Sequence, residues 1–462
     1  MGFIEKLTQF IPEVKGPKQK RLSFKEKLKW TLIILVIFFV MGLIPLFGLG
    51  QNSLQQFEFL SIILGASFGS ILSLGIGPLV TASIVLQLLQ GTGILNFELT
   101  TPEGRKKFQG LQKLLGIFFV IFESAIYVLM GGLAPAADLV GTPLFAQLQF
   151  LLIFQLFLGG MLILFMDEVI SKWGFGSGIS LFIAAGVSQQ VFIRAFNFLP
   201  SPTNPDIAAG AIPALFQSLA IGDVTTAGLQ IAAVLATIVV FVMCVYGQAM
   251  KVEIPLSFGR VRGYGMRWPL NFFYTSNIPV ILVAALLANI QLFARLLENW
   301  GLPLLGTFSG NTPVSGIVAW VFPPNLLQNI IRGSLTSQQL IQSGIYTLLM
   351  MVGAVIFSIF WMQTAGMDAK SQAKQIMSSG LQIPGFRRDE RVLEKILSRY
   401  IWPLTIVGGA AVGLLAAIAD LSGALSNGTG ILLAVMIIYK LYEEIAKQHM
   451  MDMHPMMRKF ME

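Results

Sequence analysis

Ten apolar runs divide this chain of 462 residues, and every second connection between them is basic. Each run is close to the ~20 residues that an α-helix needs to cross the hydrocarbon core of a bilayer. Because an unpaired backbone group costs several kcal/mol in hydrocarbon, these runs are predicted to be helices and not open sheet. The predicted spans are 30–49, 74–90, 114–134, 146–166, 178–198, 228–250, 271–295, 341–364, 402–420 and 428–446.

Lysine and arginine predict the orientation of the spans, because cytosolic connections carry more of these residues. Of the 31 Lys and Arg residues, all but three precede the first span, lie in the connections after spans two, four, six and eight, or lie in or beyond the last turns of span ten. The exceptions are Arg194, Arg295 and Arg332. Both termini are therefore predicted to be cytosolic.

Composition excludes several classes of protein. Only 12% of the residues are charged and 55% are hydrophobic, whereas soluble domains carry about 25% charged residues. The single cysteine, Cys244, excludes a disulfide framework and a thiolate metal cluster. The glycines that begin at Gly174 lack the spacing of a phosphate-binding loop. We expect no cofactor and no enzymatic activity.

Two histidines and five methionines lie close together in the tail, between His449 and Met457. Thioethers and imidazoles can bind copper, which is one interpretation of this segment. The other interpretation is a tail helix at the membrane surface, which we favour because such short biased segments are weak evidence. No metal site is predicted.

The order of the spans predicts two halves of opposite orientation, because each half holds an odd number of spans. The segments that begin at Ile76 and Asn277 both run from a proline through small and branched residues to a buried amide, which favours an inverted repeat. The predicted regions are a cytosolic leader 1–29 with an amphipathic helix, an N-terminal half 30–198, an external loop 199–227, a C-terminal half 228–446 and a cytosolic tail 447–462.

Three connections have features of their own. Residues 51–70 are too short and polar to span, and they read as a short helix on a small-residue hinge, either an external cap or a re-entrant element shielded by protein. The cytosolic loop 251–270 alternates around Gly259 and predicts a hairpin. The second long cytosolic loop, 366–400, carries a helical stretch and then an amphipathic lead into the ninth span.

Few ionisable groups lie within the spans, and Glu123 is the clearest one. Such charges are costly in a membrane, so their scarcity argues against a transporter coupled to ions. Three classes remain open: a channel, a secondary transporter of a small solute with a polar site at mid-membrane, and a structural scaffold.

Long stretches along the whole chain resemble the SecY family, the pore subunits of protein-conducting channels, with the greatest likeness to its archaeal form. The stretches that carry the resemblance are IPEVKGPKQKR from Ile11, GIGPLVTASIVLQLLQG (75–91), FQGLQKLLG (108–116), GSGISLFIAAGVSQ (176–189), VEIPLSFGRVRG (252–263), SNIPVILVAALLANIQL (276–292) and NGTGILLAV (427–435). The resemblance implies an all-α membrane protein with ten transmembrane helices, in two inverted five-helix halves around a central pore.

The resemblance also implies roles for particular residues. A ring of aliphatic side chains would narrow the pore at Ile76, Val80, Ile179, Ile183, Ile281 and Leu433. A plug over about 55–66 would seal its external side with Phe57, Glu58, Phe59, Leu60, Ile62, Ile63 and Leu64. A polar cluster at a lateral gate would hold Thr81, Glu123 and Asn289.

Function and partners follow from the same resemblance. It implies a passive channel in the cell (plasma) membrane that conducts unfolded preproteins and releases apolar segments sideways into membrane lipid. The implied partners are small membrane subunits of the SecE and Sec-beta type and the ribosome or another cytosolic partner. Docking would use the two cytosolic loops, at Arg260, Arg262, Arg387 and Arg388.

Overall fold

A helix overlaps each of the ten predicted apolar runs in the computed structural model of the chain. The structure describes residues 12–18, 22–52, 66–91, 94–95, 97, 101–201, 207–258, 265–275, 277–309, 312–378, 381–382 and 389–453. The helices of the N-terminal half are α2 (Phe24–Gly42), α4 (Gly77–Gly91), α5 (Pro102–Leu129), α6 (Pro143–Trp173) and α7 (Gly178–Phe196). Those of the C-terminal half are α9 (Val224–Ala249), α10 (Ile278–Asn299), α13 (Ser337–Thr364), α15 (Glu390–Leu421) and α16 (Gly428–Met453).

Seven of the described helices are long and apolar enough to cross a membrane by length and composition alone. The other three of the ten are α2, α4 and α16. Helix α4 has 15 residues, while α2 and α16 carry charged side chains along one end. The predicted amphipathic helix at the N-terminus falls largely outside the described residues.

Several of these helices begin at capping residues, whose side chains accept hydrogen bonds from backbone N–H groups that have no partner within the helix. Ser23 and Glu26 form a reciprocal capping box at the start of α2, and Thr336 and Gln339 form one at the start of α13. Because these caps lie outside the apolar runs, hydropathy alone placed the start of both helices too late in the sequence.

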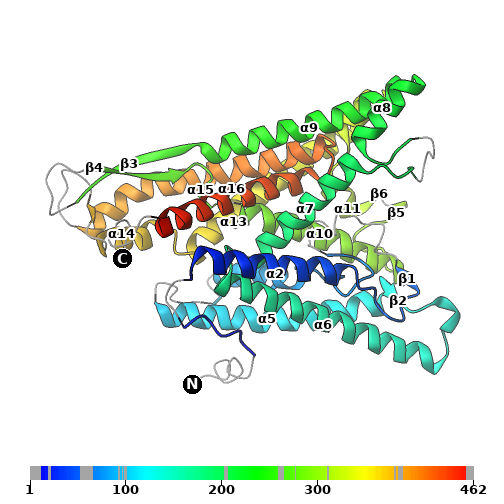
Figure 1. The fold of residues 1–462 in the computed structure, drawn as a ribbon, viewed down its shortest axis with the longest axis horizontal. Coiled ribbons are helices and arrows are strands. Elements are labelled where there is room, and N and C mark those ends of the chain that lie inside the picture. Colours follow the sequence, from blue (N-terminus) through cyan, green and yellow to red (C-terminus); the bar gives the residue numbers. More distant parts are fainter. Residues whose placement is uncertain are drawn as a thin grey trace.

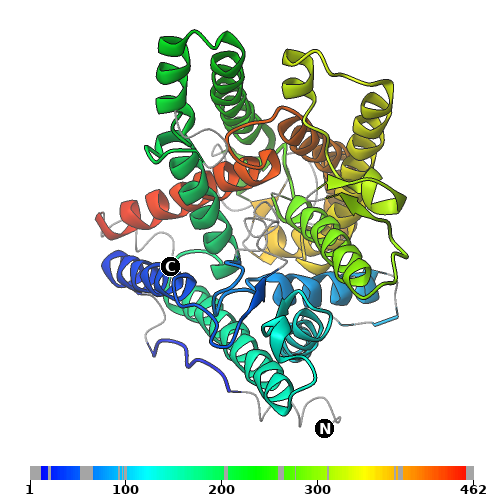
Figure 2. The ribbon, with the colours of Figure 1, turned by 90° about the vertical axis from the view of Figure 1, so that its right-hand side faces the viewer.

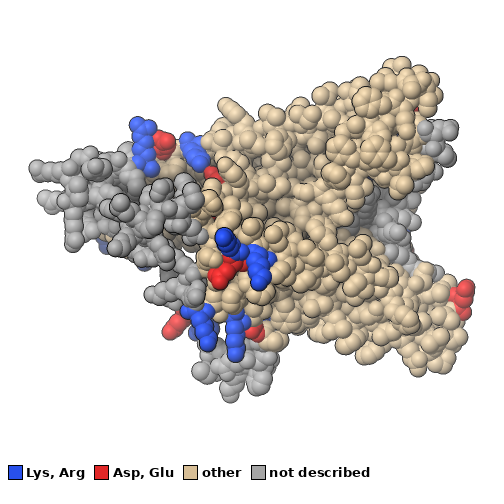
Figure 3. All heavy atoms as spheres, viewed as in Figure 1, with Lys and Arg blue, Asp and Glu red and all other residues tan. Residues whose placement is uncertain are grey.

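Strands, a short helix and most charged side chains gather at one end of the molecule, which we call the basic end. Strands β3 (Lys251–Phe258) and β4 (Gly265–Asn271) form an antiparallel hairpin, as predicted for 251–270, and β7 (Leu381–Gln382) pairs with β3. Helix α14 (Ala369–Ser378) lies at the same end (Figure 1). Figure 3 shows lysine and arginine side chains gathered there, whereas the long body of the molecule is almost free of charge on the face shown.

The opposite end carries short elements: β1 (Gln51–Asn52) paired with β2 (Leu133–Ala134), β5 (Phe308–Ser309) paired with β6 (Thr312–Pro313), the 3₁₀ turn η2 (Ala137–Leu139), α8 (Ala211–Ile221), α11 (Gly316–Val321) and α12 (Leu326–Ile331). Helix α8 lies within the predicted loop 199–227. Pro213 falls in the first turn of α8, where a missing N–H costs no helical hydrogen bond.

The two halves contact each other along two seams. At the back seam α7 packs on α16, and at the front seam α4 packs on α10 and α13. In the end-on view of Figure 2 the helices of both halves surround the middle of the molecule. Within the C-terminal half α13 and α15 approach closely, because a Cβ at Gly409 would lie 2.5 Å from Ser358 Oγ. The fold thus places residues from both halves around one centre.

Candidate functional site

The six residues predicted to form the ring lie in one hydrophobic cluster at that centre. Val80 comes from α4, Ile281 from α10 and Leu433 from α16, while Ile76 directly precedes α4. Ile76, Val80, Ile183, Ile281 and Leu433 are all buried, and Ile179 is partly buried against them. The residues follow an i, i+4 spacing in both Ile76/Val80 and Ile179/Ile183, which puts each pair on one side of its helix. All six residues thus belong to the same extended core, and Val80, Ile179 and Ile281 also line one cavity.

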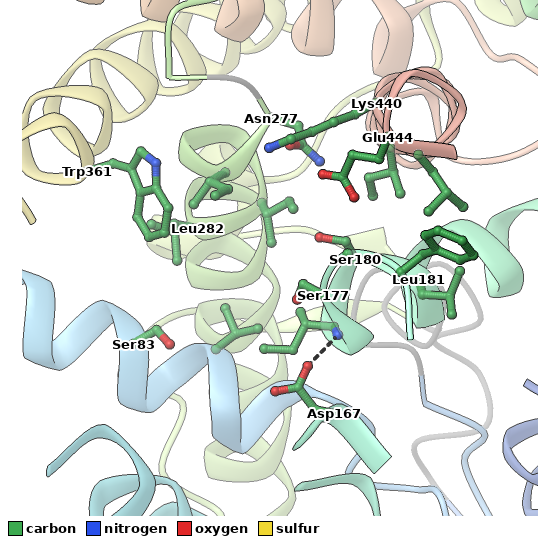
Figure 4. A pocket seen from close by; sticks show the side chains of 18 of the residues that line it. Ser83, Asp167, Ser177, Ser180, Leu181, Asn277, Leu282, Trp361, Lys440 and Glu444 are labelled. Atoms are coloured by element: carbon green, nitrogen blue, oxygen red, sulfur yellow. Dashed lines mark hydrogen bonds between the residues drawn. The ribbon is translucent and has the colours of Figure 1, made fainter. Parts of the chain in front are cut away.

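A cavity of about 460 Å³ begins at this cluster and extends toward the basic end. Val80, Ile179 and Ile281 line one part of it, and Lys440 and Glu444 of α16 line another. Figure 4 shows side chains from α4, α6, α7, α10, α13 and α16 pointing into this space. The cavity joins the aliphatic cluster to the end of the molecule where the basic residues gather.

One wall of the cavity is polar. Gln112 Nε2 of α5 donates a hydrogen bond to Ser83 Oγ of α4 at 2.7 Å, and Gln87 lies one turn further along α4. Apolar side chains of α10 and α13, among them Leu282 and Trp361, also line the cavity (Figure 4). The cavity could accept a chain that has both polar backbone groups and apolar side chains.

The three residues predicted for the lateral gate form a hydrogen-bonded group across the front seam. Asn289 Nδ2 donates to Thr81 Oγ1 at 3.0 Å, and Thr81 Oγ1 lies 3.1 Å from Glu123 Oε1, to which it can donate. Glu123 is 2% exposed, and its second oxygen accepts a hydrogen bond from no described residue. The group joins α4 and α5 of one half to α10 of the other.

Two further carboxylates were missed from the sequence: Asp167, in the last two turns of α6, and Asp420, at the end of α15. Asp167 Oδ1 accepts a hydrogen bond from the backbone of Ile179 at 3.0 Å, shown as a dashed line in Figure 4. Asp420 is 7% exposed and accepts hydrogen bonds from Tyr346 and Thr429. The sequence feature that could have identified both residues is an aspartate at the end of an apolar run, shortly before a glycine-containing turn.

A segment before α2 docks on the basic end of α5 and α6. The carboxylate of Glu13 forms an ion pair with Lys172 at 2.5 Å, and the backbone N–H of Val14 donates to Glu168 Oε2 at 2.9 Å. Glu168 also pairs with Lys113. The hydrogen bond and charge of Lys172 hold the pKa of Glu13 below its usual value. Sequence periodicity gave no indication of this docking.

The remaining predicted residues cannot be placed. All seven plug residues, Phe57, Glu58, Phe59, Leu60, Ile62, Ile63 and Leu64, lie outside the described residues, as do Arg260, Arg262, Arg387 and Arg388. Among the described basic residues of the two cytosolic loops, Arg267 pairs with Glu253 at 2.8 Å. Both side chains are largely exposed, so this pair adds little stability.

Comparison with known families agrees with this geometry. A sequence model of the SecY family matches residues 70–442, and a model described as the plug domain of Sec61p matches residues 36–69. The second match includes the segment predicted as the plug. Together the two matches cover most of the chain.

Curated relatives match over nearly their whole length. The chain is 46% identical to the protein translocase subunit SecY of Methanothermobacter thermautotrophicus, over 99% of this chain and 98% of the relative. It is 43% identical to the subunit of the same description from Pyrococcus furiosus, over 98% of this chain and 97% of the relative.

Solved structures give the same result in three dimensions. A structure described as a protein conducting channel superposes with a TM-score of 0.83 at 41% identity, over 97% of this chain and 98% of that chain. A structure of Sec61 in the canine ribosome-channel complex from the endoplasmic reticulum gives a TM-score of 0.80 at 41% identity, over 97% and 98% of the two chains. Fold and sequence agree along the whole length, and the chain belongs to the SecY family.

Proposed function

We propose that this chain is the pore subunit of a protein-conducting channel. It translocates unfolded polypeptides across a membrane and releases apolar segments sideways into lipid. The relatives named as protein translocase subunits and the structural likeness to a protein conducting channel support this function. The chain acts as a passive conduit and not as an enzyme, so the energy for transport comes from a partner.

The observation that carries the proposal is the group of aliphatic side chains, Val80, Ile179 and Ile281, that line the cavity within the hydrophobic core. Branched side chains from α4, α7, α10 and α16 meet there, and they come from both halves. A dry constriction of such side chains blocks ions by dewetting and offers no polar binding site to a small solute. The same side chains can move apart around an extended polypeptide, which is what a channel for unfolded chains requires.

Lateral release would occur at the front seam. The hydrogen-bonded group of Thr81, Glu123 and Asn289 crosses that seam, and interhelical hydrogen bonds in membranes contribute about 0.6 kcal/mol on average. Bonds of this strength hold a gate closed without making its opening slow or costly. The plug would close the external side of the ring, which is supported by the plug-domain match over 36–69.

The basic end would meet cytosolic partners. A related channel has been solved in complex with the ribosome, and the ribosome surface is rich in phosphate, which binds lysine and arginine. Arg260, Arg262, Arg387 and Arg388 belong to the two loops of this end. With the basic end in the cytosol, both termini are cytosolic and the protein lies in the plasma membrane, together with small subunits of the SecE and Sec-beta type.

A crosslinking experiment tests the proposal. Cys244 is replaced by alanine, and single cysteines are placed at Ile76, Ile179 and Ile281 in turn. A secretory chain with one cysteine is then stalled partway through the channel of the complete complex. We expect a disulfide from each of the three positions.

The control is a cysteine at Val239 of α9, which is 54% exposed on the outer surface. It should form no disulfide with the stalled chain. If an engaged chain reacts at none of the three ring positions, or at Val239 as readily, the path does not pass through the ring, and the transporter or scaffold interpretation returns.

A further inference from the structure

The two halves share a feature at the junction of their fourth and fifth helices. In each half an aspartate near the end of the fourth helix accepts a hydrogen bond from the backbone at the start of the fifth helix. These residues are Asp167 for the pair α6/α7 and Asp420 for the pair α15/α16. A carboxylate at a helix start satisfies N–H groups that have no partner within the helix, and it interacts favourably with the helix dipole.

In the N-terminal half the contact is short and direct. Asp167 Oδ1 accepts from the N–H of Ile179 at 3.0 Å (Figure 4). The preceding residue, Gly178, lets the backbones approach, because a Cβ there would lie 2.6 Å from Asp167 Cα. The first turn of α7 is thereby held against the end of α6.

In the C-terminal half the contact has the same elements and one addition. Asp420 Oδ1 accepts from the N–H of Thr429 at 2.6 Å, and Asp420 Oδ2 contacts the hydroxyl of Thr429. The preceding residue is again a glycine, Gly428, whose added Cβ would collide with the backbone of Ala419. In addition Tyr346 of α13 donates its O–H to Asp420 Oδ2 at 2.7 Å. Three helices of this half therefore meet at one carboxylate.

The two junctions lie at opposite ends of an antiparallel helix pair. Arg194, near the end of α7, lies 3.5 Å from the carbonyl of Leu425, just before α16, whereas Gly176, just before α7, and Glu444, near the end of α16, line the same cavity. An inverted repeat places equivalent features in this way, on opposite sides of the membrane.

Both helices that are held in this way carry ring residues. Ile179 supplies the N–H that Asp167 binds, and Ile183 follows one turn later. Leu433 lies one turn after Thr429, on the same side of α16. A shift at either junction would move these side chains along or around the pore axis.

We infer that Asp167 and Asp420 are equivalent positioning residues, one in each half, that set the depth and rotation of ring side chains on α7 and α16. The inference rests on the ring of the proposed function. Gly178 and Gly428 complete the two junctions, since any side chain there would separate the helices. Tyr346 links the junction of the C-terminal half to α13, which packs on α4 at the front seam.

The geometric test uses a cysteine pair and needs no transport. Cysteines are placed at Ile281 and Leu433 with Cys244 replaced by alanine, and the rate of oxidative crosslinking is measured in the complete complex in membranes. We expect Asp420→Ala to lower this rate about tenfold, because the buried N–H and hydroxyl of Thr429 and the hydroxyl of Tyr346 lose their acceptor, which costs enough to shift the helix start. Asp420→Asn, which can still accept from the N–H of Thr429, should restore most of the rate.

The matched control is Thr405→Val, which removes another buried hydrogen-bonding group from α15. Thr405 bonds to Ile401 of its own helix and contacts Met362 Sδ, with no link to the ring. Crosslinking between the ring positions should be unchanged in this variant even if its melting temperature falls by the same amount. Equal crosslinking in Asp420→Ala and the unsubstituted protein, or equal loss in Thr405→Val, overturns the inference.

Ion leak through the resting channel distinguishes an error in this inference from an error in the assignment of the ring as the ion barrier. Asp420→Ala and Ile281→Gly should both raise the leak. If Ile281→Gly leaks and Asp420→Ala does not, the ring stands and Asp420 does not position it. If neither leaks although Asp420→Ala changes the crosslinking, Asp420 positions Leu433 but the ring is not the ion barrier.

Discussion

Asn289 of α10 donates a hydrogen bond to Thr81 of α4 at 3.0 Å, and this bond crosses from one half of the protein to the other. Thr81 in turn contacts Glu123 of α5. A buried polar group within a helix pair of one half would stabilise that half only. A bond across the front seam instead stabilises one relative arrangement of the two halves, so its loss should affect gate opening more than folding.

The first prediction concerns this bond. Asn289→Leu removes it at similar side-chain volume and should shift the gate toward the open state by about 0.6 kcal/mol, about threefold in the equilibrium constant. The measurement is the rate of crosslinking between cysteines at Gln87 of α4 and Trp361 of α13, which line the same cavity. The rate should fall, and by no more than about threefold, because the closed fraction changes less than the equilibrium constant does.

Gln291 of the same helix provides the control. Its amide donates to the carbonyl of Val321 within the C-terminal half at 3.2 Å and does not cross the seam. Gln291→Leu should therefore leave the crosslinking rate unchanged. Equal effects of the two substitutions would mean that Asn289 stabilises α10 and not the closed seam.

The second prediction concerns the ion barrier. Ile281→Gly and Ile179→Gly each remove an aliphatic side chain from the buried cluster, so water can enter and ions can follow. Conductance of membranes that hold the resting channel should rise several-fold, and further in the double variant. Val239→Gly, at an exposed position of α9, introduces the same backbone freedom without opening the cluster. Unchanged conductance in the ring variants would show that these side chains are not the barrier.

The spans could be predicted from the sequence because they depend on local properties, and the orientation, which depends on local properties too, stays a prediction. Hydropathy over a window identifies a helix that must lie in hydrocarbon, and the count of basic residues in each connection depends on no other part of the chain. The start of α15 shows the limit of that signal. This helix begins at Glu390, ahead of its apolar run, because Leu393 and Leu397 pack in a separate cluster at the basic end.

Pairings between distant residues were predictable only where a family resemblance supplied them. Thr81 and Asn289 are 208 positions apart, and the resemblance alone brought them together. Tyr346 and Asp420, 74 positions apart, were missed because nothing local to either residue indicates the other. The docking of Glu13 on Lys172 was missed for the same reason, since they are separated by 159 positions.

The third prediction concerns partner docking at the basic end. Charge reversal in Arg387→Glu should weaken binding of ribosomes to the channel, and the loss should be largest at low salt, because contacts with phosphate depend on counterion release. Binding is measured by cosedimentation over a series of salt concentrations. Arg332→Glu is the control, since Arg332 is exposed near α12 at the opposite end. A loss that is the same at every salt concentration, or that appears equally in the control, would contradict an electrostatic contact at Arg387.

The fourth prediction concerns pH and the segment that docks before α2. The pKa of Glu13 is lowered by its hydrogen bond with Lys172 and by the charge of that residue. A carboxyl whose pKa is lower in the docked state stabilises docking at pH values above about 4.3, the value for a free glutamate. That contribution is lost as the pH falls from there through the lowered pKa, since the protonated carboxyl no longer pairs with Lys172.

Hydrogen exchange at Val14 provides the measurement, because its backbone N–H donates to Glu168 in the docked segment. Exchange, corrected for its intrinsic pH dependence, should accelerate between about pH 5 and pH 3 in the unsubstituted protein. In Glu13→Gln the docking should be weaker at neutral pH, and the acceleration should be lost, because the amide cannot form the ion pair with Lys172. If Glu13→Gln keeps the whole acceleration, the ion pair of Glu13 with Lys172 does not control docking.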